Sequence, residues 1–373
     1  MEFLKYIFVL GAGQAILLSV FLLNKQENKV ANRFLIFGNI IFALDLLGLI
    51  FYLDRIFYDY PHLIGINLAF PFVYGPEVYL YTKAIRQNAD KITFKNLLHF
   101  IPFAAVLIYH NFAAENLSDD FLIGIALGKF LPPLTYRIIG ILIPVHGVIY
   151  VVLTFINLKE INLKLKTAYS RIEDAEIRWM HIIVYGSAMV WIMVIIAYSL
   201  DLMTAGKFYG EAIIYISLSV FIFVLSINSY KQPQRQIKGD EPEIVSGSYK
   251  KSGLSPEFAK EQLDKLLQCL EDEKLYTQNN LSLRDLADKL EISTHNLSEI
   301  INSGLNKNFY DLINGYRIEE VKRLIENDKE ARYSIIALAF DAGFSSKTTF
   351  NTLFKKFCKM TPSEYRNSIA LTE

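Results

Sequence analysis

The chain has 373 residues, of which 52% are hydrophobic and 14% aromatic, and its mean hydropathy is +0.26. Its formal net charge is zero, which indicates no particular charged partner, and two cysteines, Cys269 and Cys358, argue against a disulfide framework. Polar residues are concentrated after Tyr230, and long apolar runs precede it. The sequence therefore predicts an all-α protein: a polytopic transmembrane helix bundle, 1–230, then a linker, 231–255, and a soluble domain, 256–373.

Seven segments before the linker are long and apolar enough to cross about 30 Å of hydrocarbon, which takes roughly 20 helical residues. They lie near 3–23, 34–53, 61–84, 94–112, 134–157, 179–203 and 210–230. The first segment is longer than the apolar region of a signal peptide and lacks a cleavage site with small residues, so we expect it to remain as a helix.

Lysine and arginine are concentrated in alternate loops, and cationic loops stay on the cytoplasmic side of a membrane. The first, third and fifth loops are rich in cations, whereas the second, fourth and sixth hold one each. This bias predicts a multi-pass membrane protein with its N-terminus outside and its C-terminal domain in the cytoplasm. A count of six or eight spans would place one terminus against the pattern.

Several polar and ionisable residues fall inside the predicted spans, where a charge costs about 2.5–3.5 kcal/mol to insert and often has a function. We regard six as candidates for a ligand pocket, with the first and fifth as a charge pair: Asp45, Asn67, Glu77, His110, Arg137 and His146. The alternative is that each forms an interhelical hydrogen bond or extends its polar end to the membrane surface.

The third span contains two prolines, Pro71 and Pro76, near its middle. A proline there removes a backbone hydrogen bond and kinks or breaks the helix. One interpretation is a hinge through which an outside stimulus moves the inner end of the helix; the other is a static kink filled by a neighbour. The hinge and the fifth loop, 158–178, are the parts expected to move.

No nucleotide-binding loop, His-Glu-x-x-His zinc motif or nucleophile elbow occurs in the sequence. We therefore expect no catalytic residues, no metal site and no cofactor, and we do not expect an enzyme. Gly11-Ala12-Gly13 lies inside the first span and indicates close helix packing rather than a dinucleotide-binding loop.

The segment 231–255 carries prolines, glycines, serines and charges, which is typical of a flexible tether. After it, Pro256 is expected in the first turn of an amphipathic helix. We expect this helix to pack against the domain that follows, with pairing between protomers as the alternative, through Phe258, Leu263, Leu266, Leu267 and Leu270.

One short helical pattern occurs twice, about 52 residues apart, at 282–302 and 334–357. In the first copy Ser282 and Ser293 are expected N-caps, and each copy contains Leu-Ala, whose small alanine lets two helices approach closely. Gly343 supplies the left-handed conformation that the sharp turn of the second copy requires. The pattern predicts two helix-turn-helix units, held apart by a long helix between them, and a last helix with a capping box at Thr361-Pro362-Ser363-Glu364.

Further residues in register are Tyr316-Arg317-Ile318, Ile336-Ala337-x2-Phe340-x2-Gly343-Phe344, Phe350, Phe354-Lys355-Lys356-Phe357 and Thr361-Pro362-x2-Tyr365-Arg366. With them, the segment 282–366 resembles the AraC-type DNA-binding domain, and the whole architecture resembles bacterial membrane-embedded AraC-type regulators. The chain departs from the family at Cys358, where a glycine is usual, and at Glu291, where the first turn often has a glycine.

The resemblance implies that one face of the second helix in each unit contacts double-stranded DNA. In the first unit this face carries His295, Ser298 and Glu299. In the second it carries Lys347, Thr348, Asn351, Thr352 and Lys355, with Lys356 beside them. Lysine and threonine suit phosphate or base-edge contacts, and the alternative for each residue is a solvated helix face.

Residues 281–373 contain 13 Lys and Arg against 13 Asp and Glu, so this part lacks the strong positive field typical of DNA-binding domains. We expect modest, salt-sensitive affinity for one head and a homodimer on DNA. The leading hypothesis is a membrane-embedded one-component transcriptional regulator that responds to an external or membrane-borne signal, with an unknown small-molecule or membrane ligand. Alternatives are a transporter or membrane enzyme with an autoregulatory DNA-binding tail, and a passive membrane anchor from which a transcription factor is released by proteolysis.

Overall fold

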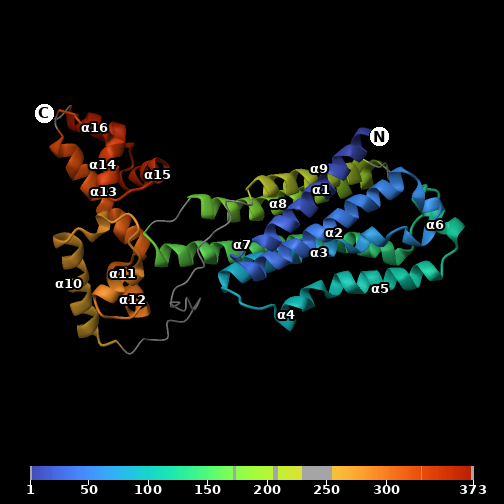
Figure 1. Ribbon diagram of the computed structural model, residues 1–373, viewed down its shortest axis with the longest axis horizontal. Helices are drawn as coiled ribbons and strands as arrows, with labels where there is room; N and C mark the ends of the chain where they lie inside the picture. Colours follow the sequence, from blue (N-terminus) through green and yellow to red (C-terminus); the bar gives the residue numbers. More distant parts are fainter. Residues whose placement is uncertain (1, 171–173, 205–208, 229–253, 329, 371–373) are drawn as a thin grey trace. The chain divides into compact units, whose positions relative to one another are not determined.

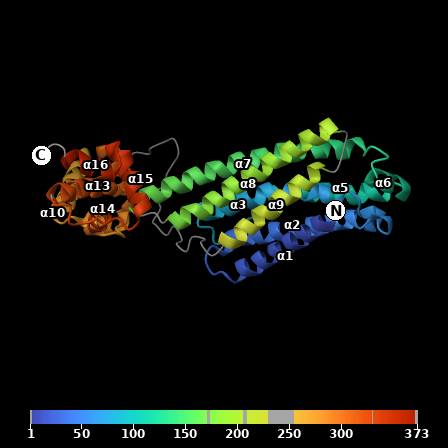
Figure 2. The same cartoon turned by 90° about the horizontal axis from the view of Figure 1, so that it is seen from above.

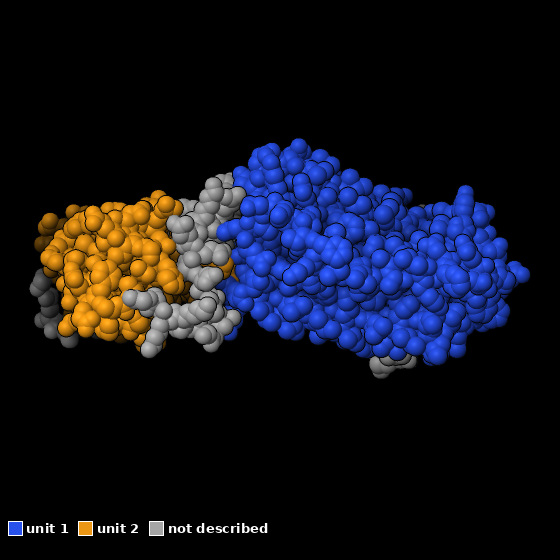
Figure 3. Space-filling model, turned by 90° about the horizontal axis from the view of Figure 1, so that it is seen from below, with its two compact units in different colours: residues 1–160, 175–237 blue, residues 161–174, 238–373 orange. Residues whose placement is uncertain are grey.

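The computed structural model describes residues 2–170, 174–204, 209–228, 254–328 and 330–370, and these ranges contain helices but no strands. Contacts divide the chain into two compact units (Figure 3). Unit 1 comprises Met1–Glu160 and Ala175–Ile237, and unit 2 comprises Ile161–Asp174 and Lys238–Glu373. The predicted all-α architecture is confirmed. The linker predicted at 231–255 falls almost entirely outside the described residues.

Unit 1 is a bundle of long helices that lie side by side (Figures 1 and 2). They are α1 (Glu2–Asn24), α2 (Lys29–Leu53), α3 (Pro71–Arg86), α5 (Ile101–Glu115), α7 (Leu134–Ala168), α8 (Asp174–Thr204) and α9 (Tyr209–Asn228), and α7 continues into unit 2. The connections between them contain η1 (Ile56–Tyr58), η2 (Pro61–Leu63), η3 (Ile66–Ala69), α4 (Phe94–Leu97), η4 (Leu98–Phe100) and α6 (Asp119–Ala126).

Among the described residues, six segments are long and apolar enough to cross a membrane, and they overlap the first six predicted spans. They are Lys5–Asn24, Lys29–Leu53, Pro61–Arg86, Phe94–Glu115, Leu134–Ala168 and Arg178–Leu200. The seventh predicted span is helical as α9, but its apolar described part, Ile213–Asn228, is shorter than the others. The count of seven therefore stays a prediction.

The third segment breaks where the prolines predict. Its first part consists of the two 3-10 turns η2 and η3, and the α-helix begins with Pro71 in its first turn, where the missing N–H costs no hydrogen bond. Pro76 lies inside α3. The fifth loop differs from its prediction, because 158–168 are not a loop but the last turns of α7.

Small residues bring the helices of unit 1 close together. A Cβ atom on Gly38 of α2 would lie 0.8 Å from Oε2 of Glu77 on α3, so only glycine leaves room for that carboxyl group. A Cβ on Gly11 of α1 would lie 2.7 Å from Oγ of Ser219 on α9. The packing function predicted for Gly11 is thereby confirmed.

Unit 2 contains two helix-turn-helix units at opposite ends of one helix, α13 (Phe309–Asn327) (Figure 1). The first consists of α11 (Leu283–Lys289) and α12 (Thr294–Leu305), and α10 (Pro256–Asp272) with the turn η6 (Leu275–Thr277) covers it. The second consists of α14 (Ile335–Asp341) and α15 (Lys347–Cys358), followed by α16 (Pro362–Ala370). The repeat and its linking helix were both predicted.

Each helix-turn-helix unit has its own hydrophobic core, and α13 contributes to both. Leu312 and Ile313 join the core of the first unit, where Leu266 and Leu270 of α10 are also fully buried. Val321 belongs to the core of the second unit. The apolar side of α10 therefore packs against the domain that follows it, as predicted for Leu263, Leu266 and Leu270, whereas Phe258 at its start is exposed.

Candidate nucleic-acid interface

Three helices of unit 2, α11, α12 and α16, begin at well-formed caps. The hydroxyl of Ser282 accepts a hydrogen bond from the amide of Asp285, whose carboxylate accepts from the Ser282 amide at 2.7 Å. The hydroxyl of Ser293 accepts from the amide of Asn296 at 3.1 Å and so caps α12. A second capping box joins Thr361 to Glu364. These predicted caps are confirmed, and the cap at Ser293 fixes where the recognition helix α12 starts.

In the first helix-turn-helix unit, α12 buries Leu297, Ile300 and Ile301 and turns its opposite side outward. His295 is exposed on that side, and Ser298 and Glu299 are half-exposed. The imidazole Nε2 of His295 lies 3.9 Å from Oε2 of Glu299. These three residues include no lysine or arginine, so this side of α12 carries little positive charge.

In the second unit, α15 is divided cleanly into a buried and an exposed side. Phe350, Leu353 and Phe354 are buried in the core. The exposed side carries the residues predicted to contact DNA: Lys347, Thr348, Asn351, Thr352, Lys355 and Lys356. The structure thus makes these six side chains accessible on one helix.

The lysines of α15 differ in their partners. The ammonium group of Lys356 forms an ion pair of 2.8 Å with Oδ1 of Asp311 on α13. Among the described residues, Lys347 and Lys355 form no ion pair. Because an unpaired ammonium group has no competing carboxylate to leave, these two are the better candidates for phosphate contacts.

The turns of the two units have the same backbone shape but different residues. Gly343 has φ +96°, and Glu291 occupies the corresponding turn with φ +55°. A Cβ atom on Gly343 would lie 2.6 Å from the carbonyl oxygen of Tyr276 and 2.7 Å from that of Thr277. The second turn therefore packs against η6, and glycine is required there for space as well as for conformation.

Arg317 on α13 connects the two helix-turn-helix units, a role that its place in the family motif did not indicate. Its side chain is 2% exposed. Its Nε donates to the carbonyl of Tyr276 at 2.7 Å and its Nη2 to that of Gln278 at 2.8 Å. Its guanidinium also lies over the ring of Phe344, 6.0 Å from the centroid. The only signal in the sequence was an arginine within the amphipathic pattern of this helix.

The six candidate ligand residues do not all gather in one place, although Asp45 and Glu77 both lie near Tyr74. The carboxylate of Asp45 accepts hydrogen bonds from the hydroxyls of Tyr74 at 2.6 Å and Tyr215 at 3.0 Å. Arg137 is exposed and forms no ion pair among the described residues. The predicted charge pair of Asp45 and Arg137 is therefore wrong, because Asp45 is buried against tyrosine hydroxyls whereas Arg137 is exposed.

The remaining candidates have separate partners. The ring of His110 contacts the Tyr136 hydroxyl at 3.0 Å and the carbonyl of His62 at 3.1 Å. Both ring nitrogens of His146 are buried without a hydrogen-bond partner, while Asn67 is half-buried in η3. Glu77 also has a buried oxygen, Oε2, without a partner, and with Tyr74 it lines a cavity of about 20 Å³.

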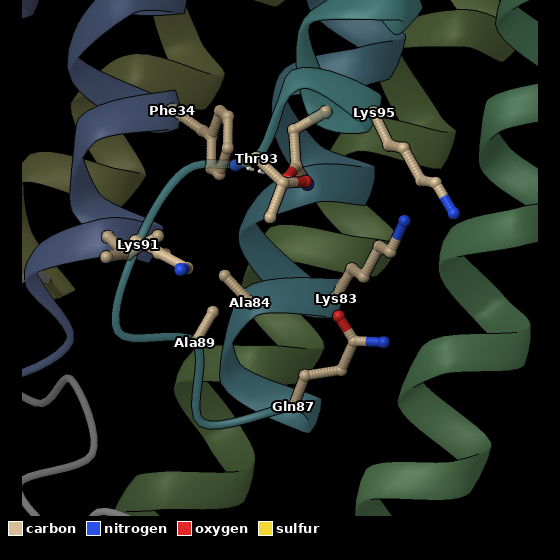
Figure 4. A pocket seen from close by; sticks show the side chains of 10 residues that line it. Phe34, Lys83, Ala84, Gln87, Ala89, Lys91, Thr93 and Lys95 are labelled. Atoms are coloured by element: carbon tan, nitrogen blue, oxygen red, sulfur yellow. Dashed lines mark hydrogen bonds between the residues drawn. The ribbon is translucent and has the colours of Figure 1, made fainter.

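A larger, open cavity of about 210 Å³ lies between α2, α3 and the segment that leads into α4 (Figure 4). Three lysines line it, Lys83, Lys91 and Lys95, together with Thr93 and Asn96. None of the three lysines forms an ion pair among the described residues. All three belong to the third of the predicted loops.

Comparison with known proteins agrees with the geometry of unit 2. Residues 286–368 match a family model described as a helix-turn-helix domain. An uncharacterized HTH-type transcriptional regulator of Staphylococcus aureus (strain COL) is 32% identical over 111 residues, which cover 30% of this chain and 14% of that protein. A second, from Haemophilus influenzae, is 25% identical over 115 residues, covering 28% of this chain and 38% of that protein.

The chain thus spans less than half the length of either relative, and no solved structure matches it. The match lies entirely within unit 2, where two capped helix pairs share one linking helix. Residues 286–368 are therefore an AraC-type helix-turn-helix domain.

Proposed function

We propose that this chain is a one-component transcriptional regulator of a bacterial inner membrane, which binds specific double-stranded DNA in response to an external or membrane-borne signal. The exposed side of α15 carries the proposal: Lys347 and Lys355 stand unpaired beside three short polar side chains, on a helix whose other side is buried. Such a helix fits the major groove, where lysine contacts phosphates and asparagine can contact adenine edges.

The DNA contacts are expected to come from both units of the domain. His295, Ser298 and Glu299 on α12 supply few positive charges, so most of the electrostatic attraction falls to α15. Because the positive charge is limited, we propose that two copies of the chain bind DNA as a homodimer, which doubles the number of phosphate contacts.

Membrane embedding is supported by the outer surface of unit 1. Large apolar side chains point away from the bundle and are mostly exposed, as in Leu10 at 69%, Leu17 at 65%, Ile108 at 71% and Ile141 at 66%. A surface of this kind is unfavourable in water and suits the hydrocarbon core of a bilayer.

The cationic cavity supports the proposed orientation. We propose that Lys83, Lys91 and Lys95 face the cytoplasm, where the membrane surface is negatively charged and attracts lysines. In cysteine-free full-length protein, Lys91→Cys should react with a membrane-impermeant maleimide only after the cells are opened. Asp120→Cys, in the fourth loop, should react in intact cells; the reverse pattern would invert the topology.

We propose that the signal acts on the polar group around Tyr74, which contacts Asp45 and shares a cavity with Glu77. Asp45→Asn should change the expression of a reporter gene controlled by the full-length protein, because it weakens two buried hydrogen bonds. Arg137→Gln is the matched control, since Arg137 is exposed. Equal effects of the two substitutions would contradict this placement of the signal.

The experiment that tests the function is genome-wide mapping of DNA bound by the full-length protein in cells. Discrete bound sites that share a sequence motif are expected, and they should disappear with Lys347→Ala combined with Lys355→Ala. Absence of enriched sites in the parent protein would contradict sequence-specific DNA binding. A soluble fragment as the bound species would show that proteolytic release, and not a tethered regulator, is the mechanism.

A further inference from the structure

The last residues of the α7 segment pack into the DNA-binding unit. Tyr169 and Ser282 form an isolated antiparallel bridge, in which the amide of Ser170 donates to the carbonyl of Leu281 at 3.3 Å. Ser170 is 1% exposed. Its hydroxyl donates to the same Leu281 carbonyl and accepts from Nη2 of Arg317 at 3.3 Å. The backbone of Tyr169 and Ser170 is thus held by the first helix-turn-helix unit.

The site that holds them is polar and buried. The carbonyl of Ser170 accepts hydrogen bonds from Nδ2 of Asn314 at 3.0 Å and from Nη1 of Arg317 at 3.3 Å. Asn314 and Arg317 are 1% and 2% exposed. A buried guanidinium must have its N–H groups satisfied, and a backbone carbonyl suits Nη1 well. The site is therefore built to bind an extended segment through its backbone.

This site contacts both helix-turn-helix units. Arg317 binds η6 on one side and lies over Phe344, in the turn of the second unit, on the other. Ser170 follows the end of α7 at Ala168 by two residues. A shift of α7 along its axis, or a rotation about it, would therefore move Tyr169 and Ser170 and act on Arg317, which contacts both helix-turn-helix units.

We propose that Asn314 and Arg317 form a docking site for the Tyr169-Ser170 backbone, and that this contact couples the fifth span to the DNA-binding domain. With Tyr169-Ser170 docked, the guanidinium of Arg317 holds the two helix-turn-helix units in one relative geometry. With the segment withdrawn, that geometry relaxes and operator affinity changes. The inference rests on the proposed function, because it treats α7 as a membrane span and unit 2 as the DNA-binding head.

A disulfide tests the contact in the full-length protein. Partners in a non-hydrogen-bonded antiparallel pair have Cα atoms about 4.5 Å apart, within the range of about 4.4–6.8 Å that a disulfide spans. In a chain with Cys269→Ala and Cys358→Ala, Tyr169→Cys is combined with Ser282→Cys, and a protease site is inserted after Gly247. After oxidation and cleavage in membranes, the two fragments should remain joined on a non-reducing gel.

The matched control combines Tyr169→Cys with Ser293→Cys, which replaces the N-cap serine of the next helix, and its fragments should separate. If the fragments of the Ser282→Cys variant also separate, although both thiols react with a maleimide after denaturation, the docking site is wrong. This readout needs no DNA, so it remains informative even if the proposed function fails.

The coupling is tested by operator affinity. The probe is a DNA fragment selected from a random-sequence library by the full-length parent protein in lipid nanodiscs. Oxidation of the Tyr169→Cys, Ser282→Cys variant should change its Kd for this fragment at least about five-fold, the lower range of allosteric coupling. An equal Kd in both redox states would make the contact a static anchor and overturn the coupling. Failure of the parent to select any sequence would instead contradict the proposed function.

A milder substitution checks the direction. Ser170→Ala removes both hydrogen bonds of the hydroxyl and should shift the Kd opposite to the disulfide. Ser199→Ala is the control, because that hydroxyl donates to the carbonyl of Ile195 in its own helix, α8, outside the DNA-binding domain. If Ser170→Ala and Ser199→Ala leave the Kd equally unchanged, the side chain of Ser170 has no part in the coupling and the proposal fails.

Discussion

The turn of the second helix-turn-helix unit should tolerate no side chain at Gly343. In Gly343→Ala, the backbone would keep a φ of +96°, a conformation that costs an L-residue about 1–2 kcal/mol. The new Cβ would also lie 2.6 Å from the Tyr276 carbonyl and 2.7 Å from that of Thr277. Overpacking of this kind costs roughly 1–3 kcal/mol. Together the terms predict a loss of about 2–5 kcal/mol, a large part of the stability of a typical domain.

Pulse proteolysis of full-length protein in detergent across a urea series measures this loss, with cleavage read out within α14 and α15. Gly315→Ala is the matched control, because a Cβ there would meet only Phe357, at an ordinary 3.7 Å, and alanine is a better helix former than glycine. The control should be stabilised by about 0.5–1 kcal/mol. A Gly343→Ala protein within 1 kcal/mol of its parent would show that the turn does not pack against η6.

Three further predictions concern unit 2. Glu291→Gly should stabilise the first unit by about 1 kcal/mol in the same proteolysis assay, because glycine adopts the left-handed conformation that glutamate holds with strain; a destabilised variant would contradict the φ of +55°. Lys355→Ala should lower operator affinity several-fold and reduce the slope of log Kd against log salt by about 1, whereas Lys356→Ala, already paired with Asp311, should do less. The hydrogen bond from Arg323, aided by Lys274, lowers the pKa of Glu320 to about 2; its stabilisation should be complete above the unfolded value near 4.5 and lost as pH falls toward 2, and a pH-unfolding curve unchanged by Glu320→Gln would refute this.

Local features of unit 2 were predictable from the sequence. The caps at Ser282 and Ser293 depend on residues three positions apart, and the structure places their hydrogen bonds as expected. The six long apolar segments of unit 1 were predictable because length and apolar composition suffice to identify them. The break at Pro71 follows from the missing N–H of proline alone.

Features that depend on helix rotation or on distant contacts were not predictable. Helices that are apolar all round show no periodicity that tells which side faces the bundle, so Asp45 was paired with Arg137 although only Asp45 is buried. The polar end of α7 was predicted to be a loop because the run of apolar residues ends before the helix does. The contact of Ser170 with Arg317 joins residues 147 positions apart, and no local pattern indicates it.

The separate cores of the two helix-turn-helix units have a consequence for how the domain opens. Because cooperative unfolding follows buried apolar contacts, hydrogen exchange should divide unit 2 into two groups of amides with different protection, and only those of α13 should report on both. A fluctuation that loosens one group leaves the other intact. Each helix-turn-helix unit can therefore unfold and refold on its own timescale while the other unit stays folded.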